Sequence, residues 1–123
     1  MTDLLRMTLR LRPDRIIIGE VRGPEALAML KAWNTGHPGG VATIHANSAT
    51  DALRRIEDLV GEASQVIPNR SIASAINLVI FIERVSGVAG RTVRHIVQID
   101  GFDGENYVVN ETSYAESAIC LRK

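Results

Sequence analysis

The feature that most constrains the fold is a run of three isoleucines at residues 16–18, which is followed directly by Gly19 and Glu20. Three consecutive isoleucines favour a buried strand of a parallel sheet. Gly19 lets the chain turn or lets another backbone approach closely. Glu20 then stands at the carboxyl end of the strand, where ligands bind in open α/β sheets, so its carboxylate is a candidate site residue. The competing interpretation is a solvent-exposed ion pair between Glu20 and Arg22.

The composition predicts one soluble globular domain. The chain has 123 residues, 46% of them hydrophobic, which is enough to bury a core. Its 14 basic and 14 acidic side chains and its few aromatic residues offer no basic groove with stacking platforms, so we expect no direct contact with nucleic acid. The one cysteine, Cys120, cannot form an internal disulfide and fits the cytoplasm. No apolar run approaches the roughly twenty residues that span a bilayer.

The apolar pattern predicts helices that alternate with strands. Helical periodicity indicates helices at about residues 3–12, 24–35 and 49–63 and a short helix that Asn69 caps. Strands are predicted at residues 16–18, 41–45, 78–82, 92–99 and 107–109, and the pattern fades from residue 111. We therefore expect an α/β fold whose sheet is parallel first and antiparallel at one edge.

A second candidate site residue, His45, ends the strand at residues 41–45. If that strand lies parallel to the isoleucine strand, Glu20 and His45 meet at one edge of the sheet. A histidine alone is more often structural, and a metal site of His37, His45 and Glu20 is a third interpretation, although their spacing lacks the regularity of zinc ligands. The charged residues of the 49–63 helix, including Arg54 and Arg55, are interpreted as a solvated face.

Two longer motifs resemble those of a known family. Residues 12–26, RPDRIIIGEVRGPEA, resemble the Walker B segment of the secretion ATPases. These are the ring-forming motors of type II and type IV secretion, type IV pili and conjugation. Residues 34–40, NTGHPGG, and 42–48, ATIHANS, resemble the histidine box of the same family. The likeness covers about residues 3–110 and is greatest to the conjugal-transfer branch of type IV secretion.

The resemblance implies a role for each candidate residue. Glu20 would be the Walker B carboxylate that orients or activates the attacking water and helps to organise Mg²⁺ through water. His45 would sense the γ-phosphate of ATP, and Arg22 and Arg91 are candidates for contacts with phosphate or with a neighbouring subunit. The implied cofactors are ATP and Mg²⁺. The implied partners are ring neighbours and the secretion or conjugation machinery, with the protein in the cytoplasm or peripheral at the inner membrane.

The chain departs from the family in one respect. The phosphate-binding loop Gly-x-x-x-x-Gly-Lys-Ser/Thr is absent, and no Gly-Lys pair occurs in the sequence. We therefore expect residues 1–110 to be the C-terminal half of a RecA-like P-loop NTPase domain and residues 111–123 to be a tail, disordered or irregular. The predicted function is a fragment of a type IV secretion or conjugal-transfer ATPase that is inactive alone. The alternative is a non-catalytic assembly or partner-binding module derived from it.

The absent loop has a structural consequence. In RecA-like sheets the strand before that loop lies between the strands found here at residues 41–45 and 78–82. Without it, two strand edges lack hydrogen-bond partners, which is costly for buried backbone groups. We expect these two strands to pair directly with each other, or self-association to fill the slot between them.

Overall fold

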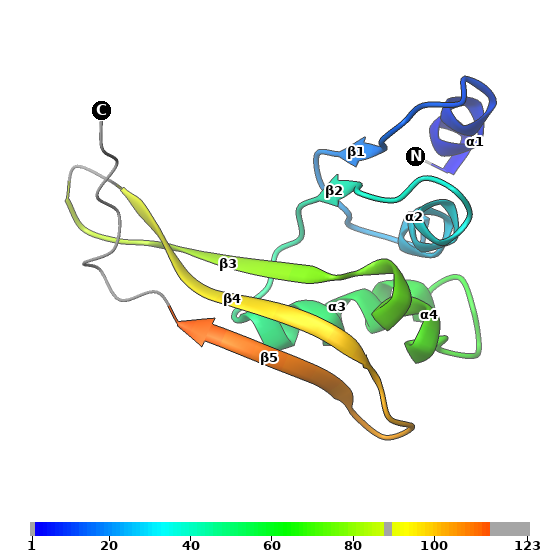
Figure 1. Ribbon diagram of the computed structural model, residues 1–123. Coiled ribbons are helices and arrows are strands. Elements are labelled where there is room, and N and C mark those ends of the chain that lie inside the picture. The colour runs from blue at the N-terminus through cyan, green and yellow to red at the C-terminus, as the bar shows by residue number, and fades with distance from the viewer. Residues whose placement is uncertain (1, 88–89, 114–123) are drawn as a thin grey trace.

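The computed structural model describes residues 2–87 and 90–113 (Figure 1). The elements follow one another in the order that the sequence predicts. They are α1 (Thr2–Arg10), β1 (Ile17–Ile18), α2 (Glu25–Asn34), β2 (Val41–Ala42), α3 (Ala49–Gly61), α4 (Asn69–Ala75), β3 (Leu78–Arg84), β4 (Arg91–Phe102) and β5 (Tyr107–Ser113). None of the helices in these two ranges is both long and apolar enough to cross a membrane.

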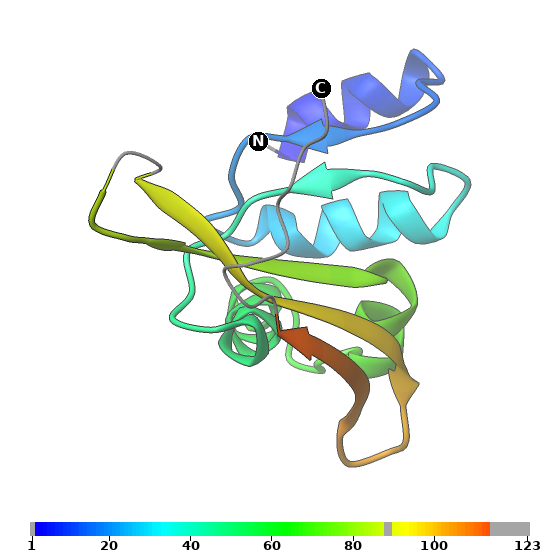
Figure 2. The same cartoon turned by 60° about the vertical axis from the view of Figure 1, so that its left-hand side comes forward.

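The strands form two sheets. β1 and β2 pair in parallel, with Ile17 opposite Val41, whereas β3, β4 and β5 form an antiparallel meander. The expected change from parallel to antiparallel strands is therefore present. In Figure 2, β1 lies above β2 and β2 lies above most of β3, while β4 crosses β3 on its way to β5.

The expected direct pairing across the slot is wrong for the described residues. β2 pairs only with β1, and β3 pairs only with β4. The physical reason is that α3 and α4 contact the meander through its core face, so β3 is held in place without an edge-to-edge contact with β2. Both facing edges remain unpaired in the described chain, and closure of the slot by self-association stays a prediction.

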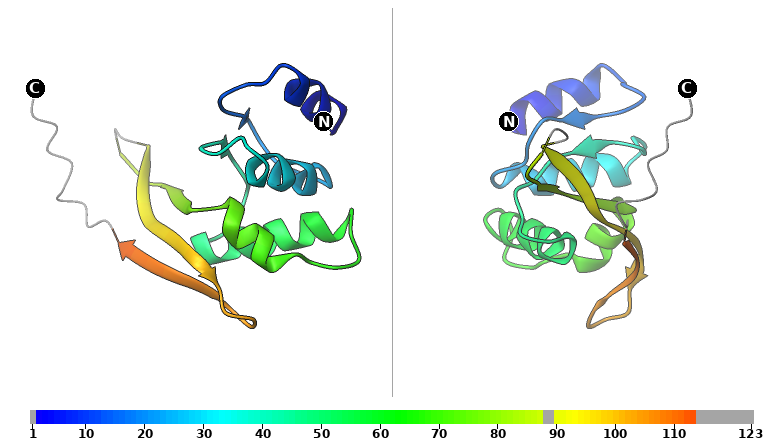
Figure 3. Two further views of the ribbon diagram at one scale, coloured as in Figure 1. Left: turned by 45° about the vertical axis from the view of Figure 1, so that its right-hand side comes forward. Right: turned by 90° about the vertical axis from the view of Figure 1, so that its left-hand side faces the viewer.

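One face of the sheets carries the helices. Helices α2, α3 and α4 lie on the same side of the strands (Figure 3, left). The core lies between these helices and the strands. Its most deeply buried large side chains are Met29, Leu30, Leu59, Val60 and Ile72.

The opposite face is bare and apolar. Ile16 and Ile18 point into the core at 4% and 6% exposure, but Ile17 is 73% exposed, so the expectation that all three isoleucines are buried is wrong. Successive side chains of a strand point to opposite faces, and only one face is covered here. We call the uncovered surface the bare face; its large apolar side chains are Ile17, Val41, Leu78, Ile80 and Ile82.

A polar cluster ties α3, α4 and β5 together. The Tyr107 hydroxyl donates to Glu57 Oε1 at 2.7 Å, and the Asn69 amide donates to the same oxygen and, at 3.3 Å, to the tyrosine hydroxyl. Burial and the bond to the Glu57 carboxylate raise the pKa of Tyr107. The expectation that Asn69 caps α4 is therefore wrong. Pro68 holds the cap position, and the side-chain amide of Asn69 instead bonds Glu57 of α3 and Tyr107 of β5.

β5 is longer than the sequence predicts. It continues to Ser113, beyond the expected domain end at residue 110, because its backbone pairs with β4 from Tyr107 to Ser113. The rest of the expected tail, residues 114–123, lies outside the described residues.

Close backbone approach occurs at Gly40 and not at Gly19. A Cβ atom on Gly40 would lie 2.8 Å from the carbonyl oxygen of Ile16 and closer still to the indole of Trp33. A Cβ atom on Gly19 would have no atom of the described chain within 4 Å, so of the two roles considered for Gly19, a turn or a close backbone approach, the close approach is not seen.

We predict that Gly40→Ala lowers the free energy of unfolding by about 2 kcal/mol, because the added methyl group must displace Trp33 and the backbone of Ile16. Gly19→Ala is the matched control and should change it by less than about 0.5 kcal/mol. Urea unfolding followed by circular dichroism measures both. Equal effects of the two substitutions would contradict the packing described for Gly40.

We predict that Tyr107→Phe lowers the free energy of unfolding by about 1 kcal/mol, because it removes a donor from the partly buried carboxylate of Glu57. A double-mutant cycle with Glu57→Ala isolates the pair. The two substitutions should be non-additive, and strict additivity would show that the hydroxyl and the carboxylate do not interact.

Candidate active site

The pairing of β1 with β2 continues past the regular strands and builds the site. The Val21 amide donates to the carbonyl oxygen of Thr43 at 2.9 Å, and the Thr43 hydroxyl donates to the carbonyl oxygen of Gly19. These bonds hold the two chain segments side by side just beyond the carboxyl ends of the strands. Glu20 and His45 come from these two segments.

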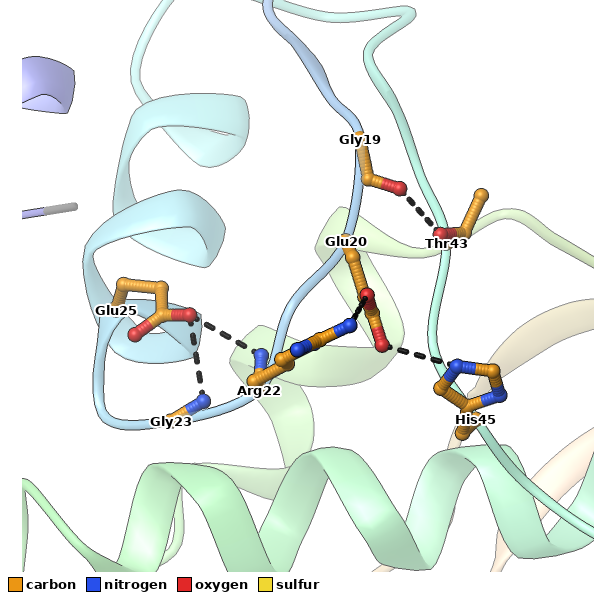
Figure 4. Close-up of polar contacts among 7 residues, drawn as sticks. All are labelled: Gly19, Glu20, Arg22, Gly23, Glu25, Thr43 and His45. Carbon is orange, nitrogen blue, oxygen red and sulfur yellow. Dashed lines mark hydrogen bonds and ion pairs between the residues drawn. The ribbon is translucent and has the colours of Figure 1, made fainter.

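The structure brings Glu20 and His45 into contact. His45 Nε2 lies 3.1 Å from Glu20 Oε1, and Figure 4 shows the two side chains pointing toward each other across the gap between the segments. The side chain of Glu20 is 23% exposed, whereas that of His45 is 90% exposed. The carboxylate is therefore the sheltered member of the pair, and the imidazole stands at the solvent side.

Arg22 engages the other oxygen of the same carboxylate. Its Nη2 atom lies 2.5 Å from Glu20 Oε2 (Figure 4). The hydrogen bond from Arg22, and in smaller measure the positive charges of Arg22 and His45, lower the pKa of Glu20. The ion pair between Glu20 and Arg22, which the sequence offered as an alternative to a site, is thus part of the same cluster.

Glu25 fixes the loop that carries Arg22. Its Oε1 atom accepts hydrogen bonds from the backbone amides of Arg22 at 3.1 Å and Gly23 at 3.3 Å. These bonds, first among them the one from Arg22, lower the pKa of Glu25. From the sequence, Glu25 is included only within the motif at residues 12–26 and is given no role. The signal that could have revealed more is its position just after a Gly-Pro pair, where loop amides lack partners.

A surface pocket of about 330 Å³ opens beside the cluster. Its walls are formed by Glu20, Val21, Arg22, Ile44, His45 and Arg55. The last of these comes from α3, whose charged side chains the sequence assigned to a solvated face. Helical periodicity reports only the direction of a side chain relative to its own helix, so it could not show that this face lines a pocket.

Two residues considered from the sequence lie elsewhere. Arg91 begins β4 opposite Arg84, at the end of the β3–β4 hairpin, and does not line the pocket. His37 is also absent from the pocket walls. Within the described ranges, no group of three or more His, Cys, Asp or Glu side chains is placed to hold a metal ion.

Comparison with known proteins identifies the class. Residues 1–115 match the family described as "Type II/IV secretion system protein", so the chain belongs to this family of secretion ATPases. It is 52% identical over 116 residues to the probable conjugal transfer protein TrbB of Sinorhizobium fredii, covering 94% of this chain and 35% of that protein. It is 56% identical over 107 residues to the conjugal transfer protein TrbB of Rhizobium radiobacter, covering 87% and 32%.

A solved structure is similar as well. The VirB11 ATPase of the Brucella suis type IV secretion system, crystallised in complex with sulphate, matches with a TM-score of 0.70 and 27% identity. The match covers 77% of this chain and 32% of that one. The chain therefore spans about a third of the length of these relatives, and the family resemblance drawn from the two motifs is confirmed.

We predict that the free energy of unfolding decreases as the pH is lowered below about 4.5, and that protonation of Glu25 contributes to this decrease. Because the pKa of Glu25 is lower in the folded state than its ordinary value of 4.5, its contribution is present above that pH and is lost as the pH falls through the folded pKa. Glu25→Gln should lower the free energy of unfolding by about 1 kcal/mol at pH 7. In urea unfolding at a series of pH values, the variant should also lose less stability on acidification, the acid limb of the profile, than the wild type does.

Glu105→Gln, which removes an exposed carboxylate from the β4–β5 turn, is the matched control and should leave the acid limb nearly unchanged. If Glu25→Gln behaves like this control, Glu25 does not hold the Arg22 loop.

Proposed function

We propose that this chain is part of the RecA-like ATPase domain of a type IV secretion or conjugal-transfer motor, and that Glu20 and His45 act on ATP. The contact between Glu20 Oε1 and His45 Nε2, at the ends of two parallel strands, carries the proposal. The identity of 52% to 56% with TrbB proteins supports the conjugal-transfer branch.

The chemistry of the cluster suits phosphoryl transfer to water. An ionised Glu20 can orient the attacking water and hold a water of a hydrated Mg²⁺ ion, which would neutralise charge on the phosphates. His45, exposed beside it, can hydrogen-bond an oxygen of the γ-phosphate. The hydrogen bond from Arg22 lowers the pKa of the Glu20 carboxyl, and the guanidinium can offset developing negative charge.

The site lacks the loop that binds the phosphates of ATP in P-loop NTPases. No Gly-Lys pair, and so no phosphate-binding loop, occurs in the 123 residues. We propose that other polypeptide segments supply these groups and that the chain alone does not turn over ATP. The location proposed is the cytoplasm, or the inner face of the inner membrane, next to the secretion machinery. The balanced charge of the chain gives no support for direct nucleic-acid binding.

A second candidate is an assembly module without catalysis. Two features favour contacts with ring neighbours or with another copy of the chain: the bare face, and the edges of β2 and β3 that have no partner in the described residues. Arg91, at the end of the β3–β4 hairpin, stays a candidate for such an intersubunit contact.

We predict that the isolated chain binds Mg-ATP with a Kd of about 1 mM or weaker, equivalent to about −4 kcal/mol, because the phosphate loop is absent. Isothermal titration calorimetry measures it directly. A micromolar Kd would mean that these residues hold the phosphates by other means.

We predict that a chimaera in which this chain replaces the matching third of Rhizobium radiobacter TrbB hydrolyses ATP. Glu20→Gln in that chimaera should lower kcat by about a hundredfold or more while nucleotide binding persists, because the carboxylate acts on water in the transition state. Glu105→Gln is the control and should leave kcat unchanged. A folded, oligomeric chimaera that never hydrolyses ATP would instead favour the assembly module.

A further inference from the structure

Arg55 is a pocket residue to which neither motif gives a role. It lies on α3 and lines the pocket together with Glu20, Arg22 and His45. In the part of the chain that the structure describes, none of the ion pairs includes it. Glu20 already has Arg22 on one oxygen and His45 on the other. Within residues 2–87 and 90–113, the guanidinium of Arg55 therefore has no anionic partner.

The charged side chains of the pocket leave an excess of positive charge. One carboxylate and two guanidinium groups give a net charge of +1 when His45 is neutral, and protonation of His45 would increase it. A concave site with one sign of excess charge attracts a ligand of the opposite sign. Guanidinium groups match phosphate oxygens best, because they offer two parallel N–H donors at fixed spacing.

We propose that Arg55 binds phosphate oxygens of the nucleotide from the α3 wall of the pocket. This inference rests on the proposed function, since it names the part of ATP that Arg55 contacts. Glu20 and His45 reach the pocket from the strand ends, and α3 runs beneath these side chains in Figure 4. The ligand would thus be held between the two walls, with its anionic oxygens toward Arg55 and its reacting phosphorus toward Glu20.

The test is a titration of the full 123-residue chain with inorganic pyrophosphate at low ionic strength, where charge attraction is least screened. The ring signals of His45 in NMR spectra report binding in the pocket. Arg55→Gln should weaken pyrophosphate binding about tenfold, the loss expected for one charge-assisted hydrogen-bonding group. Arg55→Lys, which keeps the charge without the planar pair of donors, should fall between wild type and Arg55→Gln.

Arg54→Gln is the matched control, because it removes the same charge from the neighbouring position of α3 and Arg54 does not line the pocket. It should bind pyrophosphate within about twofold of wild type, since only long-range charge is lost. Adenosine, which has no phosphate, should leave the His45 signals in place. Unchanged amide spectra of the variants without ligand exclude an effect through folding.

Equal weakening by the Arg55 and Arg54 substitutions would overturn the proposal, as would an absence of any His45 shift with pyrophosphate at the highest soluble concentration. Either result leaves the proposed function standing if the TrbB chimaera hydrolyses ATP and loses activity with Glu20→Gln. Conversely, an inactive chimaera together with Arg55-dependent pyrophosphate binding would reject the hydrolytic role and keep Arg55 as an anion-binding residue.

Discussion

The parallel pairing of β1 with β2 is the interaction on which the site depends. Each strand is regular for only two residues, yet the bond from the Val21 amide to Thr43 extends the contact to the segments that carry Glu20 and His45. Parallel strands present their carboxyl ends at one edge, so this pairing delivers a carboxylate and an imidazole to the same place. Glu25 then sets the loop from which Arg22 reaches Glu20.

The same arrangement explains why the described chain is well packed on one side only. Helices α2, α3 and α4 lie over one face, where the core forms, and the bare face is left without a cover in the described residues. The edges of β2 and β3 that face each other are unpaired. An exposed apolar face beside two open strand edges is a surface that proteins normally cover, which agrees with a chain that works in contact with further polypeptide.

The order of the helices and strands was predictable because apolar periodicity and helix caps depend only on residues that are close in the sequence. The order of elements followed from periodicity, and the helix predicted at residues 49–63 is present as α3, where the Ser48 hydroxyl accepts from the Asp51 amide at 3.0 Å. The approach of Glu20 to His45 followed from the rule for parallel strands. Periodicity does not encode tertiary packing. It could therefore not predict that the Asn69 side chain bonds Glu57 on α3, nor that Arg55 lines the pocket.

The central claim is that this chain by itself holds Glu20 and His45 in contact. The most direct measurement is the nuclear Overhauser effect between the His45 ring protons next to Nε2 and the Glu20 side-chain methylene protons in the isolated chain. We expect a clear cross-peak, together with slow exchange of the Val21 amide, because Nε2 and Oε1 are 3.1 Å apart and that amide is hydrogen-bonded. No cross-peak and fast exchange at Val21 in a folded chain would show that the pair is not formed without additional polypeptide, and would contradict the claim.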